Sequence, residues 1–138
     1  MLAGAVPRAS KRGIELSLDA PDRLVFPLDR SAFQSALNNL IDNALRYGRD
    51  GGRVNVTLQA DGEYLTLLVA DDGPGISPAS REHVFERFWR GTGHDVPGAG
   101  LGLAIVRQAA GRMGGTVHIE DGLDGRGVAF RIALPLVA

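Results

Sequence analysis

Alternating apolar and polar residues mark five short segments of the chain, and this period of two is typical of strands with one face toward a core. We expect these five strands at residues 13–19, 53–60, 64–70, 116–121 and 127–134. Short turn-forming stretches separate the second strand from the third and the fourth from the fifth. Each of these two pairs is therefore predicted to form a hairpin.

A spacing of three and four residues between apolar side chains predicts helices in other parts of the chain. The longest covers 31–47, where Asp29 or Ser31 can cap the start. A second helix is expected over 101–113, ended by the glycine pair that follows it, and a shorter one over 80–88. The order of these elements predicts an α/β two-layer sandwich, in which about three helices cover one face of a mixed sheet of about five strands.

The composition is that of a single folded domain. Of the 138 residues, 44% are hydrophobic and 22% are charged, which favours a packed core over disorder. A net charge of −1 argues against a nucleic-acid partner, and the lack of cysteine excludes disulfides and thiolate metal sites. No apolar run approaches the ~20 residues that span a bilayer. We therefore expect a linker stub over 1–12 and one domain over 13–138, without direct membrane contact.

Polar side chains on one stripe of the longest predicted helix form the first candidate site. Asn39, Asn43 and Arg46 fall at i, i+4 and i+7, beside the apolar face. Polar groups next to a core need partners, and Mg²⁺ with phosphates would satisfy two amide oxygens and a guanidinium. Taken alone, these residues are explained equally well by an ordinary solvated helix face.

A glycine-containing turn after an apolar strand forms the second candidate site. Asp71 follows the run Leu-Leu-Val-Ala, so we expect its carboxylate at the edge of the core, where the exocyclic amine of adenine is a suitable donor. Gly73 and Gly75 have no side chains and would let a flat ring approach the backbone. A plain strand-ending turn explains these residues equally well when they are taken alone.

A second glycine-rich stretch, Gly98-Ala99-Gly100-Leu101-Gly102-Leu103, leads directly into the second long helix. Glycines at a helix start expose backbone N–H groups, and the helix dipole favours a negative ligand such as a triphosphate. The stretch does not follow a strand, and no Gly-Lys-Ser/Thr follows it, so a dinucleotide fingerprint is disfavoured and a Walker loop is excluded. The glycine-rich residues 90–100 have little apolar content, which predicts a mobile loop.

Together, these stretches resemble the sequence boxes of sensor histidine kinases. Residues 39–47 resemble the N box, 71–76 the G1 box, 85–88 the F box and 98–106 the G2 box, in the family's order. The similarity covers nearly the whole chain, from about residue 13 to residue 134. The resemblance implies the Bergerat ATP-binding fold, with ATP and Mg²⁺ as ligands.

The resemblance also implies roles for individual residues. Asn43 would ligate Mg²⁺ with Asn39 assisting, and Arg46, where the family often has lysine, would contact phosphate. Asp71 would accept a hydrogen bond from the adenine amine. The other positions that would line the nucleotide site, including the hinges of an ATP lid over 90–100, are Tyr47, Gly73, Gly75, Ile76, Gly98, Gly100, Leu101 and Gly102.

One position separates the kinases from hydrolysing relatives in the wider superfamily. The gyrase, MutL and heat-shock-chaperone ATPases carry a water-activating glutamate four residues before the metal-binding asparagine, where this chain has Asn39. The resemblance therefore implies an enzyme that transfers the γ-phosphate to a protein histidine, with Asn43 and Arg46 as its catalytic residues. The alternatives are an anti-sigma-factor serine kinase and an ATP-binding module without activity in isolation.

No stretch of the chain matches the family's phosphoacceptor histidine motif. The resemblance implies that a helical dimerisation and phosphoacceptor domain of the same kinase supplies that histidine, with a response regulator as an indirect partner. We expect the isolated domain to be monomeric, and to be a cytoplasmic part of a membrane-anchored bacterial sensor kinase.

Overall fold

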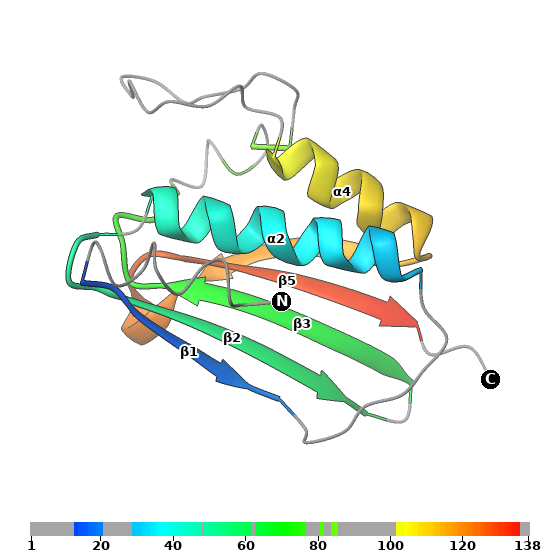
Figure 1. Ribbon diagram of the computed structural model, residues 1–138, viewed down its shortest axis with the longest axis horizontal. Coiled ribbons are helices and arrows are strands. Elements are labelled where there is room, and N and C mark those ends of the chain that lie inside the picture. The colour runs from blue at the N-terminus through cyan, green and yellow to red at the C-terminus, as the bar shows by residue number, and fades with distance from the viewer. Residues whose placement is uncertain are drawn as a thin grey trace.

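A five-stranded mixed sheet forms one layer of the protein in the computed structural model (Figure 1). The strands stand in the order β1-β2-β3-β5-β4, and β1 lies parallel to β2, whereas the other neighbouring pairs are antiparallel. Their bounds are Glu15–Asp19 for β1, Arg53–Ala60 for β2, Tyr64–Asp71 for β3, Thr116–Asp121 for β4 and Val128–Pro135 for β5. The residues that the structure describes are 13–20, 29–47, 49–61, 63–76, 81, 84–85 and 102–135.

The structure confirms the five predicted strands and both predicted hairpins. β2 and β4 have the predicted bounds, and the bounds of the other three strands differ from the prediction by one or two residues. The register pairs Val56 with Val69 and Leu67 with Ile132, so the apolar residues of neighbouring strands lie on the same face of the sheet. That shared face is the one that alternation along the chain predicts.

Two long helices form the second layer and cover one face of the sheet (Figure 1). α2 spans Arg30–Tyr47 and α4 spans Gly102–Arg112. Asp29 caps α2, because its Oδ1 accepts from the Ala32 N–H at 3.0 Å and its carbonyl accepts from the Phe33 N–H at 2.9 Å. Asp29, not Ser31, is therefore the cap.

The predicted glycine pair ends α4. Gly114 has a φ of +74°, and its N–H donates to the Gly111 carbonyl at 3.0 Å, while the Gly115 N–H donates to the Ala110 carbonyl at 2.8 Å. These two bonds satisfy carbonyls that the helix end would otherwise leave without partners. A side chain on Gly115 would lie 2.4 Å from the Ala133 carbonyl oxygen, so glycine also lets the end of α4 approach β5.

The core lies between the helices and the sheet. Its largest fully buried side chains come from both layers, and they are Leu40, Leu45, Val54, Val56, Leu65, Leu67, Val69, Val106, Phe130 and Ile132. Burying one such side chain contributes roughly 1.5–3 kcal/mol, which is more than an exposed polar contact contributes. Apolar packing therefore fixes where the ends of α2, α4 and β3 stand.

Part of the predicted chain organisation cannot be compared with the structure. The predicted segments that lie wholly or largely outside the described residues are 1–12, 80–88 and 90–100. Within the second of these, Val84 is buried, and the ring of Phe85 meets that of Phe130 edge-on with centroids 6.2 Å apart. Among the residues that the structure describes, no helix is long and apolar enough to cross a membrane.

Candidate functional site

Four chain segments meet at one end of the molecule, which we call the site end. β3 and α2 finish there, α4 begins there, and the turn between β4 and β5 lies beside them (Figure 1). α2 and α4 run in opposite directions, and an ion pair of 3.7 Å between Asp29 and Arg112 joins them at the far end. The site end therefore brings together described residues from three of the four predicted sequence boxes, the third of them from Gly102 onward.

Asp71, the last residue of β3, is buried at the site end, with 4% of its surface exposed. Its Oδ1 accepts hydrogen bonds from the Gly73 N–H at 2.9 Å and from the Val128 N–H at 3.3 Å. Burial raises the pKa of Asp71, the two N–H donors oppose that rise, and the charge of Asp72 adds to it. Among the described residues both hydrogen bonds engage Oδ1, so Oδ2 is the atom that a ligand N–H would approach.

Glycines allow two turns to touch around Asp71. Gly75 has a φ of +77°, and a side chain on it would lie 2.7 Å from the Gly127 carbonyl oxygen. Gly127 has a φ of +71°, and a side chain there would lie 2.4 Å from Asp71 Oδ1. A side chain on Gly122 would lie 2.1 Å from the Asp71 carbonyl oxygen. The turn between β4 and β5 is thus a wall behind the buried carboxylate.

Sequence reasoning misses this wall, because it treats residues 122–126 only as a connection between two strands. A signal is nevertheless available in the sequence. Gly122, Gly125 and Gly127 stand within the six residues before β5, and a tight hairpin turn does not need that many glycines.

Arg81 links the segment that follows β3 to the end of β4. Its Nε donates to the Ile76 carbonyl at 3.1 Å, and its Nη2 pairs with Asp121 Oδ1 on β4 at 2.9 Å. Ile76 is half-buried and packs against the core. Sequence reasoning does not single out Arg81, because Asp121 is 40 residues away along the chain.

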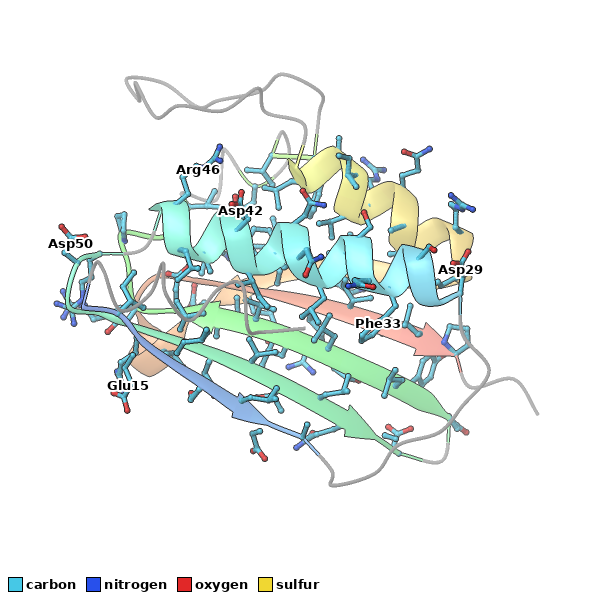
Figure 2. All side chains as sticks on the ribbon, viewed as in Figure 1. Glu15, Asp29, Phe33, Asp42, Arg46 and Asp50 are labelled. Carbon is cyan, nitrogen blue, oxygen red and sulfur yellow. The ribbon has the colours of Figure 1, made fainter. Side chains whose placement is uncertain are left out.

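The polar stripe of α2 runs beside its apolar face, as predicted. Asn39 and Asn43 are half-buried, and the Asn39 amide nitrogen donates to the Ser35 carbonyl at 2.8 Å. Arg46 is exposed and pairs with Asp42 at 3.4 Å, on the side of α2 that faces away from the sheet (Figure 2). The amide oxygens of this stripe are neutral oxygen donors, which suit Mg²⁺.

The remaining predicted site residues are described less fully. Tyr47 is the last residue of α2 and Gly102 is the first residue of α4, and the side chain of Tyr47 lies outside the described part of the chain. Gly98, Gly100 and Leu101 also lie outside the described residues. The phosphate-binding glycines and the lid therefore stay predictions.

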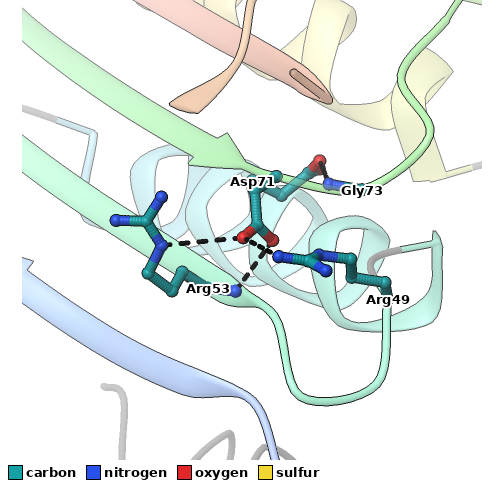
Figure 3. Close-up of polar contacts among 5 residues, drawn as sticks. Arg49, Arg53, Asp71 and Gly73 are labelled. Carbon is teal, nitrogen blue, oxygen red and sulfur yellow. Dashed lines mark hydrogen bonds and ion pairs between the residues drawn. The ribbon is translucent and has the colours of Figure 1, made fainter. Parts of the chain in front are cut away.

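Asp72 is a second buried acid, and sequence reasoning gives it no role of its own. Its carboxylate accepts at Oδ1 from the Arg53 N–H at 2.8 Å and at Oδ2 from the Arg49 guanidinium at 3.0 Å (Figure 3). Arg53 Nε also lies 3.6 Å from Oδ2. The hydrogen bond from Arg49 contributes most to lowering the pKa of Asp72 to about 2, against the opposing effect of burial. Asp72 is thus a charged group whose partners lie within the protein.

Comparison with known proteins decides the family. Residues 28–138 match the family model described as histidine kinase-, DNA gyrase B- and HSP90-like ATPase. The chain belongs to this ATPase family. The Bergerat fold and the kinship with sensor histidine kinases that the four boxes imply are confirmed.

Several sensor kinases are similar to this ATPase domain. It is 42% identical over 137 residues to the swarming motility regulation sensor protein RssA of Serratia marcescens, covering 97% of this chain and 29% of RssA. A structure of the mycobacterial sensor histidine kinase MprB matches with a TM-score of 0.82 and 36% identity, over 96% of this chain and 90% of that one. Full-length ShkA, solved in complex with AMPPNP, matches with a TM-score of 0.79 and 34% identity, over 96% of this chain and 28% of that one.

The chain spans less than a third of the length of the curated relatives that it matches. The family model and the similarity to named histidine kinases identify the chain as a domain of the histidine kinase catalytic type. The activity and the partners of a whole kinase are therefore treated below as proposals.

Proposed function

We propose that this ATPase-family domain binds Mg-ATP at the site end and donates the γ-phosphate to a histidine on a separate helical domain. The observation that carries the proposal is the buried carboxylate of Asp71, fixed at Oδ1 by two backbone N–H groups. A buried carboxylate is costly unless it is hydrogen-bonded, and the amine of adenine would compensate by donating to Oδ2. The AMPPNP complex of the similar protein ShkA supports a nucleotide at a domain of this kind.

The adenine ring would lie against backbone instead of side chains. Gly73 and Gly75 have no side chains and would let the ring approach the backbone of the turn, and the half-buried Ile76 would provide an apolar contact. Gly75 packs against Gly127, so the turn at Gly127 would close the back. A side chain at Gly75 or Gly127 would displace this wall, because both positions touch neighbouring backbone.

α2 would hold the metal and the phosphates. The amide oxygen of Asn43 would ligate Mg²⁺ with Asn39 assisting, and the guanidinium of Arg46 would pair with a phosphate oxygen. Mg²⁺, when bound, would neutralise charge on the phosphates. The part of the chain in the reaction is then to position the nucleotide and to offset charge, without forming a covalent bond to it.

Asn39 favours transfer to a protein over hydrolysis. It stands one helical turn before Asn43, and an amide cannot accept a proton from an attacking water as a carboxylate does. The acceptor that we propose is a histidine on the dimerisation and phosphoacceptor domain, and a response regulator would then receive the phosphoryl group. The glycines at 98, 100 and 102 would let a lid close over the triphosphate, and Leu101 would line the nucleotide site.

Calorimetric titration with AMPPNP, with and without Mg²⁺, tests the binding part of the proposal. We expect saturable binding by the wild type, a loss of about 100-fold in affinity in Asp71→Asn, and an altered Mg²⁺ dependence in Asn43→Asp. Asp61→Asn makes the same change at the other end of the β2–β3 hairpin and is expected to bind as the wild type does. Absence of saturable binding by the folded wild type would overturn the proposal.

A phosphotransfer assay tests the catalytic part. The ATPase domain is incubated with labelled ATP and a separately purified helical phosphoacceptor domain. We expect label on the acceptor that is lost in acid, because phosphohistidine is acid-labile. Acid-stable label would indicate an anti-sigma-type serine kinase, and nucleotide binding without label would indicate a binding module.

A further inference from the structure

Asp72 connects the turn after β3 to the turn that leads from α2 into β2. The latter covers Arg49 to Gly52 and is closed by a hydrogen bond of 3.0 Å from the Gly52 N–H to the Arg49 carbonyl, with Gly51 at a φ of +73°. The Asp72 carboxylate accepts from the guanidinium of Arg49, the first residue of that turn. It also accepts from the backbone N–H of Arg53, the residue that follows the turn. We call Asp72, Arg49 and Arg53 the Asp72 clamp (Figure 3).

The Asp72 clamp is tightly packed as well as hydrogen-bonded. A side chain on Gly52 would lie 2.5 Å from Asp72 Oδ1 and 2.7 Å from Arg49 Cγ, so only glycine leaves room for the carboxylate. The Gly52 carbonyl also accepts from the Glu15 N–H at 2.9 Å, which ties the same turn to β1. Asp72 is 3% exposed, so water has little access to its carboxylate. The position of the turn relative to the end of β3 is therefore fixed.

The turn that Asp72 holds lies next to the end of α2. Only one residue stands between Tyr47, the last residue of α2, and Arg49. On the other side, Asp72 directly follows Asp71. The Asp72 clamp thus joins the two parts of the site that sit on different elements, namely the carboxylate on β3 and the polar stripe on α2.

We propose that Asp72 is a positioning residue that, through Arg49 and Arg53, sets the separation between Asp71 and the metal- and phosphate-binding end of α2. This inference rests on the proposed function, since it assigns adenine to Asp71 and the triphosphate to α2. The affinity of a ligand that contacts both Asp71 and α2 depends on the separation of these two parts. The affinity of a ligand that contacts only Asp71 does not. If the Asp72 clamp merely stabilised the fold, its loss would weaken the binding of both ligands alike.

The test compares two ligands, AMPPNP with Mg²⁺ and adenosine, on the wild type and on clamp variants. Arg49→Gln is the principal variant, because it opens the Asp72 clamp at a half-exposed side chain and leaves the neighbour of Asp71 unchanged. We expect Arg49→Gln and Asp72→Asn to weaken AMPPNP binding about tenfold, which is typical when a contact that supports a binding residue is lost. The affinity for adenosine should change less than about twofold. Arg49→Lys should restore most of the AMPPNP affinity, and the double variant Arg49→Gln/Asp72→Asn should bind no worse than Asp72→Asn.

Arg112→Gln is the matched control. It breaks an ion pair with Asp29 at the far end of the helices and is expected to leave both affinities unchanged. Equal weakening of AMPPNP and adenosine, or no weakening of AMPPNP in Arg49→Gln, would overturn the inference while leaving the proposed function intact. Wild-type protein that binds neither ligand would contradict the proposed function itself. If Asp72→Asn does not fold, Arg49→Gln alone still decides between these outcomes.

Discussion

Asp71 and Asp72 are adjacent in the chain, yet their surroundings shift the pKa values of the two carboxylates in opposite directions. Burial raises the pKa of Asp71, and among the described residues two backbone N–H donors oppose that rise. Asp72 is equally buried but meets two arginines, and the hydrogen bond from Arg49 lowers its pKa most. Asp71 therefore suits the ligand contact that we propose for it, whereas Asp72 already has two arginine partners within the protein.

Replacing Asp71 by asparagine is expected to stabilise the unliganded protein at neutral pH. Because the folded-state pKa of Asp71 lies above its ordinary value of 3.8, folding favours the protonated form, and wild-type stability falls as pH rises through that pKa. Asparagine keeps an oxygen for both N–H donors without the charge. We expect the melting temperature of Asp71→Asn at pH 7 to exceed that of the wild type by about 4 °C.

Thermal unfolding of both proteins between pH 3.5 and pH 7 checks this, and the difference should shrink toward the acid end. A variant that is less stable than the wild type at pH 7, while still folded, would show that the carboxylate is already well compensated without a ligand.

At the scale of residues, sequence reasoning succeeds where the chain itself encodes the environment. The apolar run before Asp71 predicts its position at the edge of the core, and the burial of Asp71 confirms it. The same reasoning misses the partners of Asp72, because Arg49 lies 23 residues away and meets it only through the pairing of β2 with β3. A motif shows that an acid is present, but not which loops reach it.

At the scale of elements, two glycines before β5 share a left-handed backbone conformation but differ in how closely they are packed. Gly125 and Gly127 have φ values of +73° and +71°, but a side chain on Gly125 would meet open space and one on Gly127 would meet Asp71. We expect Gly125→Ala to lower the free energy of unfolding by about 1 kcal/mol, because only the backbone conformation is unfavourable for alanine there. Nucleotide binding should be unchanged. Gly127→Ala should cost about 3 kcal/mol and weaken AMPPNP, since it displaces the wall behind Asp71.

Urea unfolding and calorimetric titration of these two variants give both quantities. If both alanine variants lose nucleotide affinity to the same extent, the wall at Gly127 has no special part in the site.

The cap of α2 can be tested in the same way. Asp29→Ala removes an acceptor from the Ala32 N–H and should lower the free energy of unfolding by about 1 kcal/mol. Ser31→Ala is the control, because Ser31 is exposed inside the first turn, and a change within about 0.5 kcal/mol is expected. Equal losses in the two variants, measured by urea unfolding, would contradict the assignment of Asp29 as the cap.

Elements as a whole are well predicted because each carries its own period. The alternation of β2 and β4 gives their bounds directly, and the spacing in α2 and α4 gives theirs within one residue. The contact between Gly127 and the turn at Gly75 is not predictable in this way. It arises only when β5 pairs with β3 and brings two distant turns to the same end of the sheet.

At the scale of the whole molecule, the site end is built from segments that are far apart in the chain and are held by one core. Nucleotide binding to the folded state alone should therefore stabilise the whole domain. With AMPPNP and Mg²⁺ at 100 times the dissociation constant, we expect the free energy of unfolding to rise by about 2.7 kcal/mol. The melting temperature should then rise by about 8 °C. Asp71→Asn should show no such rise in the same thermal scan, and a rise of equal size in that variant would contradict the role given to Asp71.

The strand order has a consequence for the way the domain opens. β3 stands in the middle of the sheet, with β2 on one side and β5 on the other, whereas β1 and β4 each have a single neighbouring strand. In hydrogen exchange, amides of such edge strands exchange through small local openings, and those of a central strand exchange only when the whole domain unfolds. Asp71 ends that central strand. Local opening of β1 or β4 should therefore leave β3, and the backbone of Asp71 at its end, folded.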